Sequence, residues 1–193
     1  MNKEEMFLDE LGYISDDSLA DALLNIINML PDYWFHEAAS SSGKYHPEYS
    51  LGEGGLLRHS KAAMRIGFDL LNDPSIGDKY SSHEKDLMLM AILVHDGLKR
   101  GLPAERHTRF DHPILMANFI VDNAKEIGLN KDDAKFMADT IKTHMGPWIT
   151  DYDGNEVLEK PKTKYQNFVH LCDYLASRKF LLVPFDKDNN ISI

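Results

Sequence analysis

The segment that most constrains this chain is an apolar run at residues 87–94, which is followed directly by His95 and Asp96. Eight consecutive apolar residues predict a buried element, either a core helix or a buried strand. Burying an imidazole and a carboxylate beside it costs several kcal/mol unless each finds a partner. A divalent cation is such a partner, so the dipeptide predicts a metal site at the end of a core element.

The rest of the chain has helical periodicity almost throughout, which favours a helix for the apolar run as well. Polar residues 36–54 and 148–162 are predicted to be loops. Asn130 is expected to cap the helix that follows it. Helices are predicted at about residues 15–30, 55–72, 83–99, 112–128, 130–146 and 163–182.

These elements predict an all-α fold, a single-domain helical bundle that spans residues 1–193. Its core is expected at about 34–182, with the N-terminal helix at 15–30 packed on it. The length of 193 residues suits one domain with a full hydrophobic core. Scattered acids such as Asp69, Asp73 and Asp86 are interpreted as solvent-exposed.

The amino-acid composition limits which partners the protein is expected to bind and in which compartment it is expected to lie. The net charge of −10 argues against long duplex nucleic acid, whose binding depends on many phosphate contacts, but it allows a small anionic substrate. No apolar run is long enough to span a bilayer, and the N-terminal residues lack a signal-peptide core. The single cysteine, Cys172, excludes an intrachain disulfide, so we expect a cytoplasmic protein with no membrane partner.

Further histidines and an aspartate fall on apolar helix faces. His59 lies three residues after Leu56 and four before Ala63, so its side chain is expected to point inward. His144 and Asp173 occupy similar places on later helices. A lone core histidine is more often a hydrogen-bonded packing residue than a ligand, but a set of six is harder to explain in that way. The candidate ligands are His59, His95, Asp96, His112, His144 and Asp173.

The order of these residues, together with the strings around them, resembles the HD-domain superfamily of metal-dependent phosphohydrolases. The resemblance covers about residues 34–180 and is closest to stand-alone members, including ones carried by bacteriophages. The usual family motif is His-Asp-Ile-Gly-Lys; here Gly97-Leu98 replaces Ile-Gly, and Lys99 keeps the family spacing. The strings that carry the resemblance are GGLLRHS at 54–60, LVHDGLK at 93–99, DHP at 111–113, THMG at 143–146 and LCDYLAS at 171–177.

The resemblance implies a bimetallic site. It assigns His59, His95, Asp96 and Asp173 to one ion, with Asp96 bridging to a second ion. His112 and His144, which mononuclear members lack, would hold that second ion. Imidazole and carboxylate donors without thiolate suit Mn, Fe, Ni or Co, with Mg or Zn as further options.

The predicted activity is hydrolysis of a phosphoester or phosphodiester bond in a nucleotide or short oligonucleotide by a metal-activated water. Asp96 and Lys99 are the candidate catalytic residues, and Lys99 is expected to hold a phosphate oxygen rather than to be a solvated helix end. Weaker candidates for substrate contact, each of which could equally be a surface or supporting residue, are Arg58, His107, Arg109, Trp148 and Arg178.

Three other interpretations stay open. Strings at 35–39 and 45–49 resemble the 3′-to-5′ exoribonuclease branch of the superfamily, which makes an exonuclease on single strands the first alternative. A second alternative is a non-catalytic sensor that binds a nucleotide without turnover. The third is a helical interaction protein in which the His and Asp residues only satisfy one another.

Overall fold

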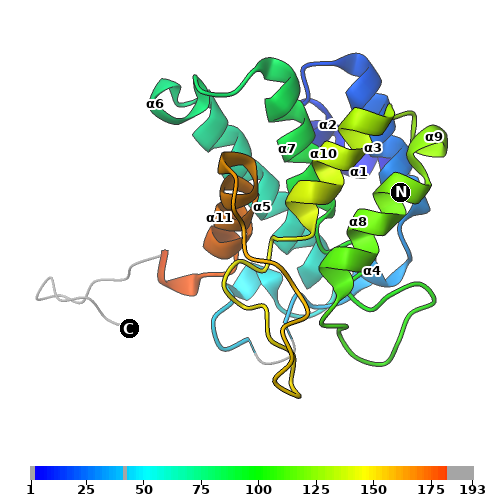
Figure 1. Ribbon diagram of the computed structural model, residues 1–193, viewed down its shortest axis with the longest axis vertical. Coiled ribbons are helices and arrows are strands. Elements are labelled where there is room, and N and C mark those ends of the chain that lie inside the picture. Colours follow the sequence, from blue (N-terminus) through cyan, green and yellow to red (C-terminus); the bar gives the residue numbers. More distant parts are fainter. Residues whose placement is uncertain (1–2, 41–42, 182–193) are drawn as a thin grey trace, which may run out of the picture.

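Helix α7 (Ser82–Val94) is the central element of the computed structural model (Figure 1). Residues 86 to 94 are all buried, as expected for a helix that is apolar on every side. Helices α5 (Gly55–Asn72), α10 (Lys131–Ile141) and α11 (Lys164–Ala176) pack around it. The apolar run of the sequence is therefore the core helix of a bundle.

The structure describes residues 3–40 and 43–181, and no β-strand occurs within these ranges. The predicted all-α fold is confirmed. None of the helices in this described part combines the length and apolar character needed to cross a bilayer. The remaining elements are α1 (Lys3–Met6), α2 (Leu8–Leu11), α3 (Asp17–Met29), α4 (Tyr33–His36), η1 (Glu48–Ser50), α6 (Pro74–Gly77), α8 (His112–Asp122), α9 (Ala124–Ile127) and η2 (Lys179–Leu181).

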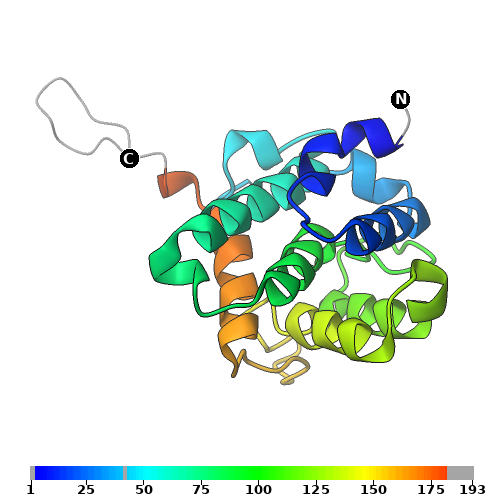
Figure 2. The same ribbon diagram turned by 90° about the horizontal axis from the view of Figure 1, so that it is seen from above.

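The bundle has two helix pairs with α7 between them. Helix α11 packs against α5 and α8 packs against α10, and α7 contacts α5, α10 and α11 (Figure 2). Helix α3 covers α7 and α9, as predicted for the N-terminal helix. The ends of α7 and α10 and the start of α8 therefore meet at one end of the bundle, where the loops cross (Figure 1).

Local caps explain where the main helices begin. At α7 the Ser81 hydroxyl accepts from the amide of Glu84 at 3.2 Å, while the Ser81 amide donates to the Glu84 carboxylate at 2.8 Å. Thr163 and Gln166 form the same reciprocal pair at α11. The side chain of Asn130 accepts from two amides of α10, which confirms the predicted cap.

Three helices end earlier than predicted. Helix α7 stops at Val94, so His95 and Asp96 lie in the turn that follows rather than inside a longer helix. A Cβ on Gly97 would stand 2.7 Å from a methyl carbon of Leu30 and 2.9 Å from the sulfur of Met116, so a larger residue here would have to displace both side chains. Helix α10 ends at 141 and α11 at 176, and the predicted helix 112–128 is split into α8 and α9.

Asp86 corrects the sequence-based interpretation, because its carboxylate is buried rather than solvent-exposed. It accepts three hydrogen bonds from the residues that precede α3: the Ser15 amide at 3.1 Å, the Ser15 hydroxyl at 2.7 Å and the Asp16 amide at 3.1 Å. The carboxylate therefore joins the start of α3 to the central helix. Helical periodicity did not reveal this role, since α7 has no polar face.

We predict that Asp86→Ala lowers the free energy of unfolding by about 2–4 kcal/mol, because three hydrogen bonds to a buried, charged acceptor are lost. The matched control is Asp69→Ala, whose carboxylate is exposed and pairs with Arg65 on the surface. That change should stay within about 0.5 kcal/mol of the parent chain. Urea unfolding of both variants measures the difference; equal stabilities would contradict the role given to Asp86.

Candidate metal centre

The helix ends bring the six predicted ligands together. His59 lies on α5 and Asp173 on α11, while the others belong to the ends of α7, α8 and α10. Their side chains are buried, apart from that of Asp173, which is 19% exposed. Of the predicted set, the structure places His59, His95, Asp96, His112, His144 and Asp173 in one continuous cluster.

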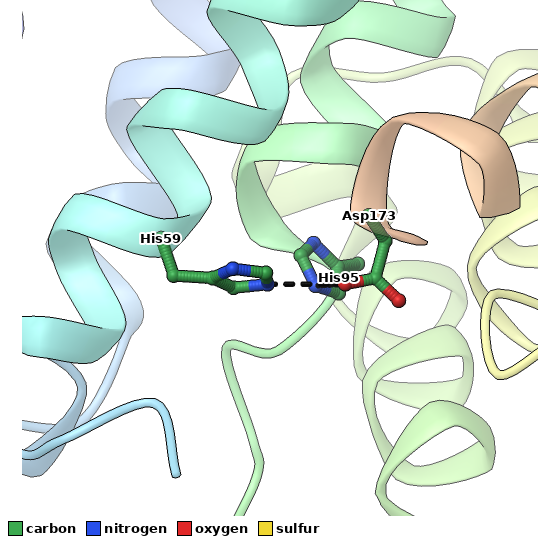
Figure 3. A group of neighbouring side chains, drawn as sticks. All are labelled: His59, His95 and Asp173. Carbon is green, nitrogen blue, oxygen red and sulfur yellow. Dashed lines mark hydrogen bonds and ion pairs between the residues drawn. The ribbon is translucent and has the colours of Figure 1, made fainter. Parts of the chain in front are cut away.

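One part of the cluster centres on the Asp173 carboxylate. Its Oδ1 atom lies 3.0 Å from Nε2 of His59 and 3.5 Å from Nε2 of His95. Figure 3 shows the His59 ring pointing at this carboxylate with His95 beside it. Two imidazole nitrogens from different helices thus face a single carboxylate oxygen.

The other part of the cluster centres on Asp96. Its Oδ1 atom lies 2.9 Å from Nε2 of His112 and 3.7 Å from Nε2 of His144. Its Oδ2 atom lies 3.6 Å from Nε2 of His95 and 2.5 Å from Nζ of Lys99. The two oxygens therefore face different histidines, as a carboxylate shared between two centres requires.

Backbone contacts fix the tautomer of three of the histidines. Nδ1 of His95, His112 and His144 lies 2.6, 2.7 and 2.8 Å from the carbonyl oxygen three residues earlier. A carbonyl only accepts, so Nδ1 carries a hydrogen, and Nε2 is the atom that each ring can present to a metal ion. Metal-binding histidines are typically oriented in this way.

The two carboxylates of the cluster, Asp96 and Asp173, stay ionised and attract positive charge. Burial raises the pKa of Asp96, but the charges of Lys99 and His95 outweigh it and hold that pKa well below its usual range. Burial lowers the pKa of His95, yet Asp96 and Asp173 raise it to about 9. Burial and the neighbouring imidazoles lower the pKa of His144 to about 4, so this ring is neutral near pH 7.

The donor set fits a metal ion. Two groups have ligand atoms within 4.8 Å of one another: His59, His95 and Asp173, and His95, Asp96 and His144. Buried Nε2 of His95 has no hydrogen-bond partner among the described residues. Nε2 of His112 lies only 3.2 Å from Nε2 of His144, and two facing lone pairs repel unless a cation or proton lies between them. Nitrogen and oxygen donors of this kind could hold divalent ions.

A cavity of about 250 Å³ opens onto the cluster. Lys99, Trp148 and Arg178 line it, as expected for three of the predicted substrate contacts. Sequence reasoning assigned no site role to His46, although its string was noted, because a loop has no periodicity that shows where a side chain points. The other lining residues that sequence reasoning missed are Thr108, Met145, Tyr174 and Ser177.

The other predicted substrate contacts do not line this cavity. The Arg58 guanidinium donates to the carbonyl oxygens of Tyr49 at 2.5 Å and Leu51 at 2.9 Å, so it holds the loop before α5. Arg109 forms ion pairs with nearby carboxylates. His107 lines a neighbouring cavity that shares His46 and Thr108 with the first.

Comparison with known proteins adds one finding to this geometry. The family model described as HD domain matches residues 56–178, which is well over half of the chain and includes the whole His and Asp cluster. Neither the curated proteins nor the solved structures contain a significant match. A match of this extent establishes the family: the chain belongs to the HD domain family.

Proposed function

We propose that this protein is a divalent-metal-dependent phosphohydrolase that cleaves a phosphoester or phosphodiester bond of a nucleotide or short oligonucleotide. HD domains are typically metal-dependent hydrolases. The observation that carries the proposal is the set of three histidines whose Nδ1 atoms are held by backbone carbonyls and whose Nε2 atoms converge on Asp96. That arrangement suits ligation better than packing alone.

In this proposal, some residues of the cluster hold metal ions and another binds the substrate. His59, His95, Asp173 and Asp96 would hold one ion, and Asp96, His112 and His144 a second. Divalent ions at such a centre supply an acidified water and neutralise charge on the phosphoryl oxygens. Asp96 stays ionised in the core, which keeps both of its oxygens available as ligands. Lys99 lines the cavity beside Asp96, where its ammonium group would bind a phosphate oxygen.

The exonuclease alternative has one specific observation in its favour. A second cavity of about 960 Å³ adjoins the first through His46 and Thr108. Arg106 and His107 line it, together with Arg100, whose guanidinium is paired with Glu37 of the same cavity. Such a path would suit a single strand longer than one nucleotide.

The first prediction concerns the number of metal ions. After reconstitution with Mn or Fe, the protein should bind close to two ions per chain, because the cluster has more donors than one ion requires. Metal analysis should give about one ion for His112→Ala or His144→Ala. Binding should also raise the melting temperature, since the ions bind the native state. A stoichiometry of one that neither substitution changes would contradict the two-ion site.

The second prediction concerns the shared carboxylate. Asp96→Asn keeps the shape of the side chain but removes its charge, so hydrolysis should fall below detection and both ions should bind more weakly. Metal analysis and a panel of nucleoside phosphates, cyclic nucleotides and short oligonucleotides measure the two effects, with circular dichroism as the check on folding. Wild-type turnover in this variant would show that the cluster does not do the chemistry. If the parent chain binds one of these compounds but does not hydrolyse it, the result would favour the alternative of a non-catalytic nucleotide sensor.

The third prediction separates Lys99 from the ligands. Lys99→Ala should keep its metal content but lose about ten- to a hundredfold in kcat/KM, the value of one charged phosphate contact. Lys162→Ala is the matched control, because this lysine pairs with Glu159 on the surface. Steady-state kinetics on the best substrate of the panel makes the comparison. Equal kinetics in both variants would limit the role of Lys99 to its ion pair with Asp96.

A further inference from the structure

Arg178 occupies an unusual position at the edge of the cavity. Its guanidinium carbon lies 4.2 Å from the ring centroid of Tyr174, 5.4 Å from that of Tyr45 and 5.6 Å from that of Trp148. Aromatic faces attract a cation and hold the planar guanidinium in place. The side chain is therefore positioned before any ligand arrives.

Within the part of the chain that the structure describes, the side chain of Arg178 keeps unused hydrogen-bonding capacity. Its Nε atom is buried and has no hydrogen-bond partner among these residues. Among the described residues no carboxylate forms an ion pair with this guanidinium, whereas Arg58 and Arg109 are both engaged in contacts of their own. A buried donor without an acceptor is costly unless a ligand supplies one.

Arg178 also shares the cavity with the candidate catalytic groups. Asp96, Lys99 and Arg178 all line the same space of about 250 Å³. Trp148 lies at its rim with 47% of its surface exposed, and its ring is nearly parallel to that of Tyr174, at an interplanar angle of 14°. One small molecule could therefore reach the cluster, Lys99 and Arg178 together.

We propose that Arg178, held between Tyr45, Trp148 and Tyr174, binds a phosphate group of the substrate other than the one that is hydrolysed. Planar arginine is suited to two-point recognition of phosphate, while Lys99 acts as a point charge at the reacting group. This inference rests on the proposed function and narrows its substrate class. The preferred substrate carries two phosphate groups, as in a dinucleotide with a terminal phosphate.

The test compares dinucleotides that differ in one phosphate. A dinucleotide without a terminal phosphate is measured beside the same molecule with a 5′-phosphate and with a 3′-phosphate. The parent chain should prefer one of the phosphorylated forms by about tenfold or more in kcat/KM, with most of the difference in KM. Arg178→Ala should lose that preference, because its kcat/KM should fall much further on the preferred phosphorylated dinucleotide than on the unphosphorylated one.

Two controls separate recognition from structure. Arg65→Ala removes an exposed arginine on α5 that pairs with Asp69, and it should keep the preference. Arg178→Lys retains the charge but not the planar fork, so it should recover only part of the preference. If Arg178 only stabilised the aromatic cluster, its removal would lower the melting temperature and change all three substrates equally.

Binding without turnover provides an independent measurement. The chain has two tryptophans, and Trp34 is fully buried, so fluorescence changes on ligand addition report mainly on Trp148. In the metal-free protein, the phosphorylated dinucleotide should change this fluorescence at lower concentration than the unphosphorylated one, and Arg178→Ala should remove the difference. Equal binding of both dinucleotides, or a preference that survives in Arg178→Ala, would overturn the inference. Failure of hydrolysis with normal selective binding would overturn the proposed function instead.

Discussion

The ionised carboxylate of Asp96 is the group on which the architecture depends. It lies in the core at the end of α7, where burial alone would drive it to the neutral form. It stays charged chiefly because Lys99 and His95 lie beside it, and His112 and His144 face it from the start of α8 and the end of α10. The ends of α7 and α10 and the start of α8 therefore meet at the Asp96 carboxylate, and the cavity forms at this place.

The parts that the sequence predicted well have local causes. Helix α5 begins and ends where the periodicity of residues 55–72 places it, and Asn130 caps α10 through its own side chain. The six cluster residues were predicted to point inward from helical spacing and from the resemblance to a family. Spacing placed His59, His144 and Asp173, because each of these lies on a helix or within a turn of one, where the backbone sets the direction of the side chain.

The parts that were missed depend on contacts distant in sequence. Asp86 binds residues about seventy positions earlier, so nothing near it distinguished it from a surface acid. His46 reaches the cavity from a loop, and Arg58 turns away from the cavity to the carbonyls of the preceding loop. The early end of α7 was missed as well, because the apolar run itself continues to Val94 and Gly97 alone is a weak helix-stop signal.

The histidine-to-carbonyl contacts have a consequence for how such a protein can diversify. Each of the three rings is aimed by its own backbone turn, not by side chains from other helices. The direction of each imidazole ring therefore depends on only a few residues of the local chain. The cavity walls formed by Trp148 and Tyr174 can change by substitution while the donor atoms keep their direction. Selection can therefore act on recognition and on reactivity as nearly separate traits.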